Sequence, residues 1–388
     1  MRVLLTSTDN PYTTRLGGKH VHLLLLEQGL KASGLEVTTL YRRQGLAQTV
    51  KKGALMCLPE RARYEHKLKW MIDDLRGRIP KQEFDVVHAH DVLSMIAVQS
   101  MTQKKVLTLH GYFARENIEF IKKEKDRAMV FPFLLQLEKE GMKDADYIVA
   151  VDQRLKDYVL SDFNWPVDKV RVMHNAVDTD TFKPIPEEQQ RELKKSLGLE
   201  KDHYVVLVPR RLVEKNGVVY AVRALRAVKR QDVDLVIAGD GPERKKIVAE
   251  ASGDARAHLL GTVPHDKIVQ YYQMADVILI PSVTSHGIQE ATSLAMLEGM
   301  ACGKVSICSD IGGMREIIRN MQNGMLVPEK EPKEIAKAIS TVIGNQGLSA
   351  EIGTKARECV LQNHSFEAHA KLVFSIYQKV LDGRETWR

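Results

Sequence analysis

Cysteine and long apolar runs are scarce in this 388-residue sequence, and each shortage excludes a class of protein. No apolar run approaches the roughly 20 residues that a membrane-spanning helix needs. The start lacks the apolar stretch and cleavage site of a signal peptide, so residues 2–6 are expected to form a first buried strand. The cysteines show neither a CxxC pair nor zinc-ligand spacing, and free thiols in a reducing cytoplasm are expected. They are Cys57, Cys302, Cys308 and Cys359.

Two motifs of cofactor and metal sites are also absent. A nicotinamide-binding sheet would place G-x-G-x-x-G directly after its first strand, followed by an acidic residue about 20 positions on. The loop at 9–19 contains only the pair Gly17-Gly18. No D-x-D stands at a strand end in the second half, so no metal ligands and no cofactor are predicted.

Positive charge is in modest excess, with a formal net charge of +7. Residues 42–81 carry much of it, with 11 lysines and arginines against 4 acidic residues. Only two aromatic residues, Tyr64 and Trp70, accompany them, so no nucleic-acid partner is expected. Two interpretations stay open: a solvated face, or a face for anionic lipid or an anionic acceptor at the inner side of a membrane.

Short apolar runs alternate with segments of helical periodicity along the chain, the pattern of parallel βαβ units. The runs are Arg2–Thr6, Glu36–Leu40, Asp85–His90, Lys105–His110, Tyr147–Asp152 and Val170–Asn175 in the first half, and Tyr204–Arg210, Asp234–Asp240, His258–Thr262, Val277–Val283, Val305–Asp310 and Gly324–Pro328 in the second. Each half has enough strands for its own sheet. The predicted fold class is α/β, with two Rossmann-like, doubly wound domains at 1–175 and 176–365.

Ligands bind such sheets beyond the carboxyl ends of the strands, which makes Glu290 and Glu298 candidate site residues. They lie eight positions apart after the strand 277–283, in a segment expected to be helical from Glu290 onwards. Eight helical residues span about 12 Å, too far for an acid–base pair at one glycosidic bond but suitable for one elongated ligand. Backbone N–H groups at the helix start would bind a diphosphate. These belong to Thr292, Ser293 and Leu294.

Cations end the first strand of the second half, in the run Val208-Pro209-Arg210-Arg211-Leu212-Val213-Glu214-Lys215-Asn216-Gly217. Fixed cations at the carboxyl end of a parallel strand can bind an anionic ligand such as a phosphate. The run is therefore a candidate phosphate site, and the resemblance described below points to Arg211 and Lys215 within it. Two cations on a solvated strand end are the alternative.

The first half offers His110, which ends an apolar strand, and the pair Gly17-Gly18. A lone histidine at a strand end is more often structural, and a turn explains a glycine pair equally well. His88 and His90 end the preceding strand and are expected to be structural.

Together these motifs resemble the retaining glycosyltransferases of family 4, the group 1 glycosyl transferases, whose fold is GT-B. The approach Val277-Ile278-Leu279-Ile280-Pro281-Ser282 and the segment from Glu290 to Gly303 are similar to the family's E-x7-E region. Arg211 matches its G-R-L-x-x-x-K-G run. Further matches are Asn175-Ala176-Val177-Asp178 with Phe182, Ala238-Gly239-Asp240-Gly241-Pro242 and Leu260-Gly261-Thr262-Val263.

The resemblance implies that a sugar moves from a nucleotide diphosphate donor to an acceptor in a cleft between two domains, without a metal. Domain 1–175, with helix 366–388 crossing back onto it, would bind the acceptor, and domain 176–365 the donor. Glu290 and His110 would be catalytic contacts of the sugar, and Glu298 would hold the ribose. The remaining donor contacts would come from Gly17, Gly18, Arg211, Lys215, Val263, Thr292, Ser293 and Leu294.

Two departures from the family pattern concern the donor site, and the sequence leaves the base, the sugar and the acceptor open. Ala291, Thr292 and Ser293 stand where the family often has Gly-Phe-Gly, and Asn216 fills its lysine position, one residue after Lys215. A UDP-sugar is the first expectation and GDP-mannose the second. The acceptor would be a glycan, a lipid-linked molecule or a small molecule.

Two other function classes remain. A GT-B epimerase or hydrolase of nucleotide sugars needs no acceptor, so product analysis without acceptor separates it from a transferase. A non-catalytic protein that binds RNA or a membrane surface would explain 42–81, but not the glutamate pair, the cations and His110 together. It predicts that labelled RNA or lipid binds while nucleotide sugars cause no thermal shift.

Overall fold

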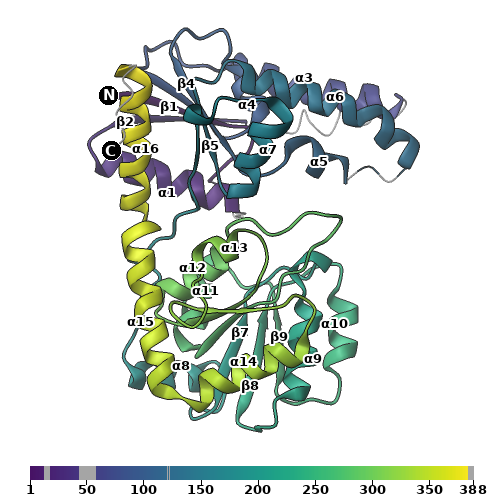
Figure 1. Ribbon diagram of the computed structural model, residues 1–388, viewed down its shortest axis with the longest axis vertical. Helices are drawn as coiled ribbons and strands as arrows, with labels where there is room; N and C mark the ends of the chain where they lie inside the picture. The colour runs from purple at the N-terminus through teal and green to yellow at the C-terminus, as the bar shows by residue number, and fades with distance from the viewer. Residues whose placement is uncertain (13–17, 43–57, 120, 122, 383–388) are drawn as a thin grey trace. The chain divides into compact units, whose positions relative to one another are not determined.

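The computed structural model describes residues 1–12, 18–42, 58–119, 121 and 123–382, which form two compact units (Figure 1). Unit 1 comprises the described residues up to His174 and from His369 onwards, and unit 2 comprises Asn175–Ala368. Among the described residues, no helix is long and apolar enough to cross a bilayer.

Each unit contains one six-stranded sheet in which all neighbouring strands are parallel. The order in unit 1 is β2-β1-β3-β4-β5-β6, with β1 (Arg2–Ser7), β2 (Glu36–Tyr41), β3 (Val86–Ala89), β4 (Lys104–Leu109), β5 (Tyr147–Ala150) and β6 (Val170–Val172). The order in unit 2 is β12-β11-β10-β7-β8-β9, with β7 (Tyr204–Val208), β8 (Val233–Ala238), β9 (Ala257–Gly261), β10 (Val277–Ile280), β11 (Val305–Ser309) and β12 (Met325–Val327). Every predicted run overlaps one strand, so the predicted fold class is confirmed.

Helices flank both sheets. Those of unit 1 are α1 (Gly18–Ala32), α3 (Glu60–Arg76), α4 (Val92–Ala97), α5 (Phe113–Ile118), α6 (Glu124–Lys143), α7 (Gln153–Phe163) and most of α16 (Phe366–Asp382). Those of unit 2 are α8 (Glu187–Ser196), α9 (Val218–Ala227), α10 (Arg244–Ala251), α11 (His265–Met274), α12 (Leu294–Ala301), α13 (Gly312–Ile317), α14 (Pro332–Gly344) and α15 (Gln346–Asn363).

The apolar runs form strands because both faces of each parallel sheet are covered. Successive side chains of a strand point to opposite faces. In β7, Val206 and Val208 pack in a core cluster with Leu225 of α9, whereas Val205 and Leu207 belong to a second cluster that includes residues of α11 and α12. A strand buried on both faces shows a continuous apolar run, which is the signal that predicted these sheets.

Helix α16 begins in the last residues of unit 2, and from His369 onwards it contributes to the core of unit 1 (Figure 1, yellow). Val373, Ile376 and Tyr377 are fully buried. They share one apolar cluster with Val3 of β1 and Val86 of β3. The chain therefore returns to the first sheet after completing the second.

The described cysteines are free thiols, as expected, and Cys57 lies outside the described residues. Cys302 and Cys308 are buried, and burial raises the pKa of Cys302 to about 12. These two thiols are therefore protonated and unreactive at neutral pH.

Candidate active site

The sheet of unit 2 changes direction between β7 and β10. From β7 the chain proceeds through β8 to β9 on one side, and from β10 through β11 to β12 on the other. In open parallel sheets ligands bind beyond the carboxyl ends of the strands at such a switch point. The residues that follow β7 and β10 are therefore the first place to look for a site.

Arg210 occupies that position, two residues after β7, and is buried with 9% of its surface exposed. Its Nη2 donates to Glu290 Oε2 at 2.6 Å, to Asn216 Oδ1 at 2.6 Å and to Ser282 Oγ at 3.1 Å. Its Nη1 donates to Ser293 Oγ at 3.2 Å. One guanidinium thus joins the ends of β7 and β10 to the segment that leads into α12. We call these five residues the Arg210 cluster.

Glu290 is held in its ionised form. Burial raises its pKa, but the charge and hydrogen bond of Arg210, together with the charge of Lys215, keep the pKa below the ordinary value. An ionised carboxylate only accepts hydrogen bonds. Glu290 can therefore accept from hydroxyl groups, and it cannot serve as a general acid at neutral pH.

Two glycines allow the backbone to approach closely around Arg210. Gly239 follows β8, and a Cβ there would lie 2.0 Å from the Arg210 carbonyl oxygen. Gly217 has a positive φ of 62°, and a Cβ there would lie 1.8 Å from the Pro281 carbonyl oxygen. A side chain at either position would separate β7 from its neighbours and displace the guanidinium.

Helix α12 begins at Leu294, later than the sequence predicted. Glu290 precedes the helix, and the expectation that it lies at the helix start was wrong. The Glu290 carbonyl accepts the N–H of Gly313 at 3.1 Å, and the Gln289 side chain accepts the N–H of Gly312 at 3.1 Å. These contacts hold the segment against α13, so its backbone is not available for helical hydrogen bonds.

The start of α12 adjoins the Arg210 cluster. Ser293 is the N-cap residue, yet its hydroxyl contacts Arg210, and it makes no side-chain capping bond. Thr292 and Ser293 are buried, Leu294 is partly exposed, and the Thr292 carbonyl accepts from Asn175 at 3.2 Å. The first N–H groups of a helix have no partner within the helix and carry its positive dipole end. An anion is therefore favoured here.

Glu298 lies in the second turn of α12 and makes a different contact. It is buried, and Tyr272 of α11 donates to its Oε2 at 2.5 Å. Burial raises the pKa of Glu298 to about 7, against the hydrogen bond of Tyr272 and the charge of Arg210, which lower it. Glu298 is therefore close to half-ionised at neutral pH, whereas Glu290 is fully ionised.

The two predicted phosphate ligands, Arg211 and Lys215, are exposed. The Asn216 side chain bridges the two arginines: its Oδ1 accepts from Arg210, and its Nδ2 donates to the Arg211 carbonyl at 2.7 Å. Arg210, which the sequence analysis did not select, is the arginine that contacts Glu290. The pair Arg210-Arg211 at a strand end indicates that an arginine belongs to the site, but the sequence does not show which of the two side chains is buried.

The other donor-binding candidates lie at loops and helix starts. Val263 lies between β9 and α11, with its side chain partly buried. Gly18 is the first residue of α1 and is exposed, and Gly17 lies outside the described residues.

His110 follows β4 in unit 1 and lies among other histidines. Its Nε2 is 3.4 Å from Nδ1 of His90, which follows β3, and its ring centroid is 4.6 Å from that of His22 in α1. Burial, with the nearby His22 and the charge of Lys19, lowers the pKa of His110 well below its ordinary value. The imidazole is therefore neutral at pH 7 and offers one donor and one acceptor.

His88 has the structural role expected of it. Its Nδ1 lies 2.7 Å from the Tyr377 hydroxyl and its Nε2 lies 2.7 Å from the Thr108 hydroxyl. Both ring nitrogens are thus used inside the core. His90 differs, because its ring faces His110.

Asp91, which the sequence analysis missed, organises the switch point of unit 1 between β1 and β3. It caps α4 by accepting the N–H of Ser94 at 2.8 Å, and it accepts the N–H of Thr8 at 2.8 Å. Lys19 lies 3.1 Å from Asp91 and 2.6 Å from Asp9. This network ties the end of β1 to the start of α1, which carries His22.

Part of the basic stretch 42–81 lies outside the described residues, which omit 43–57. In the described part, all four acidic residues pair with arginines of or next to α3: Glu65 with Arg61, Glu60 with Arg63, Asp73 with Arg76 and Asp74 with Arg78. Such exposed pairs contribute about 0–1 kcal/mol each. The excess charge of the described part is then carried by Arg42, Lys67, Lys69 and Lys81.

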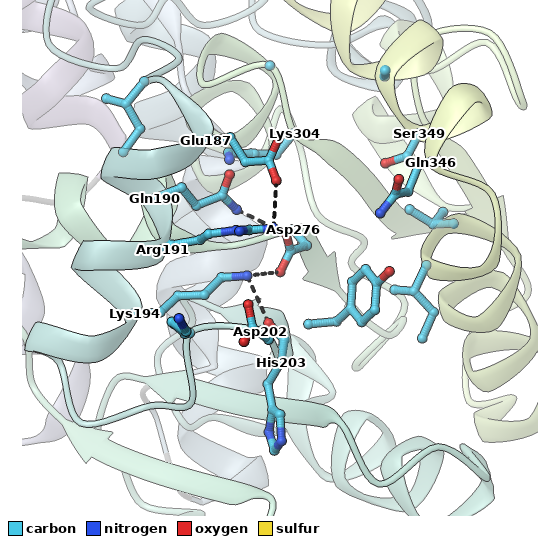
Figure 2. Close-up of a pocket in the computed structure, with 17 residues that line it drawn as sticks. Glu187, Gln190, Arg191, Lys194, Asp202, His203, Asp276, Lys304, Gln346 and Ser349 are labelled. Carbon is cyan, nitrogen blue, oxygen red and sulfur yellow. Dashed lines mark hydrogen bonds and ion pairs between the residues drawn. The ribbon is translucent and has the colours of Figure 1, made fainter.

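A separate pocket of about 470 Å³ lies at the opposite edge of the unit 2 sheet (Figure 2). It is lined by residues next to the amino ends of β7, β10 and β11 and by parts of α8 and α15. Lys194 donates to Asp276 and to the His203 carbonyl, each at 2.8 Å. None of the candidate residues that the structure describes lines this pocket.

Comparison with known proteins finds a matching family for each half of the chain. Residues 16–181 match the family described as Glycosyltransferase Family 4, and residues 189–359 match the family of group 1 glycosyl transferases. The chain belongs to the group 1 glycosyl transferases of family 4. An uncharacterised glycosyltransferase of Methanocaldococcus jannaschii is 26% identical over 98% of this chain and 99% of its own length. A D-inositol 3-phosphate glycosyltransferase of Acidothermus cellulolyticus is 26% identical over 95% of this chain and 87% of its own length.

Solved structures show that this glycosyltransferase has the GT-B fold. Sucrose-phosphate synthase from Thermosynechococcus elongatus superposes with a TM-score of 0.77 at 19% identity, over 99% of this chain and all of the other. The Anabaena protein HepE in complex with UDP-glucose gives a TM-score of 0.70 at 18% identity, over 98% of this chain and all of the other.

Proposed function

We propose that this glycosyltransferase moves a hexosyl group from a nucleotide diphosphate to a glycan, lipid-linked or small-molecule acceptor, with retention of configuration and without a metal. The observation that carries the proposal is the buried Arg210–Glu290 ion pair beside the start of α12, at the switch point of unit 2. A UDP-sugar is the first choice, favoured by the UDP-glucose bound to the similar HepE structure, and GDP-mannose is the second.

Unit 2 is the donor domain in this proposal. Glu290, fixed by Arg210, accepts hydrogen bonds from hydroxyls of the transferred sugar, and Glu298 accepts from the ribose. The start of α12, with Arg211 and Lys215, binds the diphosphate, since a helix N-terminus and cations both stabilise phosphate charge. The backbone around Val263 contacts the base.

Unit 1 is the acceptor domain. His110, as a neutral imidazole, positions a hydroxyl of the transferred sugar, and the backbone at Gly17-Gly18 approaches the donor phosphate. The acceptor hydroxyl needs a base, and a donor phosphate oxygen held by Arg211 and Lys215 serves this purpose. The proton moves to that oxygen as the new glycosidic bond forms and the sugar–phosphate bond breaks.

A thermal-shift panel of nucleotide sugars tests the proposal. A ligand at 100 times its Kd adds about 2.7 kcal/mol to the free energy of unfolding. We expect UDP-sugars to raise the Tm most. If no nucleotide sugar shifts the Tm while labelled RNA or lipid binds, the chain is a non-catalytic binding protein.

The product of an α-linked donor should be α-linked. Glu290 is the carboxylate beside the proposed sugar position, and its pairing with Arg210 reduces its nucleophilicity, so we expect front-face attack without a stable glycosyl-enzyme. NMR of the fresh product measures the configuration. A β-linked product would contradict retention, and an adduct on Glu290 seen by mass spectrometry would indicate double displacement.

Transfer should survive chelation. The cations Arg211 and Lys215 and the start of α12 stabilise the diphosphate charge that a divalent ion neutralises in other transferases. Initial rates with and without EDTA should agree within experimental error. Loss of activity on chelation, restored by Mg²⁺ or Mn²⁺, would show that these two cations and the helix start are insufficient.

Donor affinity should rise with pH because of Glu298. Its pKa of about 7 means that a ribose diol meets the better acceptor, the carboxylate, only above that pH. From pH 8 to pH 6 the donor Kd should increase about tenfold, the limit for one required deprotonation. Calorimetry measures it, and Glu298→Gln should bind weakly at both pH values. A wild-type Kd that does not change with pH would exclude the role of Glu298.

The proposal extends to location. The free thiols favour a cytoplasmic enzyme, and the lysines of 42–81 favour peripheral contact with an anionic inner membrane face. Sedimentation with vesicles containing phosphatidylserine, at low and high salt, tests this contact.

A further inference from the structure

Three histidines from three separate segments converge in unit 1. His22 comes from α1, His90 follows β3 and His110 follows β4. Each offers one ring nitrogen, and these nitrogens all lie within 4.8 Å of one another. His22 and His90 are buried, and His110 is partly exposed.

The spacing of the rings fits one tetrahedral metal ion. With metal–nitrogen bonds of about 2.05 Å, two ligand nitrogens lie about 3.3 Å apart and their ring centroids about 5.2 Å apart. His90 Nδ1 and His110 Nε2 are 3.4 Å apart. The centroids of His22, His90 and His110 are 4.6, 5.5 and 5.7 Å apart. The His90–His110 pair thus has the required spacing, and the ligand nitrogen of His22 lies within 4.8 Å of both.

Neighbouring rings pack against two of the three imidazoles, those of His22 and His90. The His369 ring meets the edge of the His22 ring at 4.7 Å, and the His88 ring lies 4.3 Å from that of His90. Rings that are already fixed lose little entropy when a metal binds, and partners around the ligands orient them.

The chemistry of the ligands selects the metal. A neutral imidazole coordinates a metal through one ring nitrogen, and each of the three histidines offers one. Imidazole suits Zn²⁺, Co²⁺, Ni²⁺ and Cu²⁺, whereas Mg²⁺ and Ca²⁺ prefer oxygen.

One positive charge opposes a metal at this place. Lys19 is close enough to lower the pKa values of both His90 and His110. Its ammonium lies between Asp9 and Asp91, at 2.6 and 3.1 Å, and the two carboxylates offset its charge. The charge of Lys19 is therefore largely neutralised, and its repulsion of a metal ion at the three histidines is weakened.

We propose that His22, His90 and His110 form a binding site for a late first-row divalent metal ion of the Zn²⁺ class, with a fourth position open to water or another ligand. The sequence predicted no metal ligands. The metal at this site is not needed for transfer, which is proposed to proceed without one. When occupied, the site uses a nitrogen of His110. The metal therefore inhibits transfer, a consequence that rests on the proposed function.

Cobalt titration of the full chain, carrying no histidine tag and without nucleotide sugar, tests the site. We expect one Co²⁺ per chain, with the intense visible bands of four- or five-coordinate cobalt, and displacement by Zn²⁺. His22→Phe keeps a ring in the core and should weaken Co²⁺ binding at least tenfold, as should His90→Gln. His66→Asn removes an exposed histidine of α3 and should change nothing.

The outcomes separate the two claims. Absent bands, or bands that persist in both His22→Phe and His90→Gln when these variants keep the wild-type Tm, overturn the site. If either variant loses stability, its folded fraction is titrated at lower temperature, so the comparison still decides. Cobalt binding without Zn²⁺ inhibition of transfer would leave the site in place and remove His110 from catalysis.

Discussion

Arg210→Ala should lower both the stability and the transfer activity of this enzyme. The substitution leaves the buried Glu290 carboxylate without its cation, and breaking a buried pair in this way costs about 3–5 kcal/mol. It also removes the contacts to Asn216, Ser282 and Ser293 that join the ends of two strands to the start of α12. We expect kcat/KM of the folded protein to fall about 100- to 1,000-fold, because a preorganised electrostatic contact is lost.

The neighbouring arginine provides the matched comparison. Arg211→Ala removes an exposed side chain, so urea unfolding should show an unchanged midpoint, while the donor Kd rises about tenfold or more with the loss of one charge-assisted bond. Arg210→Lys keeps the charge but not the planar fork, and should recover part of the stability only. Equal effects of Arg210→Ala and Arg211→Ala on the unfolding midpoint would contradict the central position of Arg210.

The sheets could be predicted because their signal is local. A strand covered on both faces shows as a run such as Val277–Ile280, in which every residue is buried. The turns that follow the runs then mark the carboxyl ends, where Glu290 and His110 were sought and where they lie.

The start of α12 could not be predicted in the same way. Acidic and small residues before an apolar periodic stretch favour a helix from Glu290 onwards. The backbone bonds from Gly312 and Gly313 prevent it, and they come from a segment more than twenty residues away. Local helix propensity cannot predict tertiary contacts of this kind.

Orientation at a strand end is equally hidden. Arg210 and Arg211 have the same chemistry, and one register step decides which is buried. Gly239 makes room for the Arg210 backbone, but this can be seen only once β8 lies beside β7. The histidine group shows the same limit, since β3 and β4 must pair before His90 and His110 become neighbours.

The two glutamates of unit 2 share one sequence motif but have opposite environments. Arg210 lowers the pKa of Glu290 below its ordinary value, while burial beside Tyr272 raises that of Glu298 to about 7. A charged contact suits the reacting sugar, where positive charge develops as the bond to phosphate breaks. The ribose develops no charge during transfer, so its contact with Glu298 contributes to donor binding rather than to the transition state.

Glu290→Ala should therefore chiefly lower turnover, and Glu298→Ala should chiefly weaken donor binding. For Glu290→Ala we expect kcat to fall about 100-fold or more, with a donor Kd within a few-fold of wild type. For Glu298→Ala we expect the Kd to rise about tenfold, the value of one or two hydrogen bonds, with kcat largely kept. Single-turnover rates at saturating donor, with calorimetric Kd values, measure both.

Glu290→Gln is the control for stability. The amide keeps the volume and an acceptor oxygen for Arg210. The urea midpoint of Glu290→Gln should therefore be higher than that of Glu290→Ala, although the ion pair is gone. Turnover should still fall, because the amide cannot supply the negative charge that the transition state requires. If Glu290→Gln turns over at the wild-type rate, or if both alanine variants change only the Kd, the charge of Glu290 has no part in catalysis. The Arg210–Glu290 ion pair would then only stabilise the donor site.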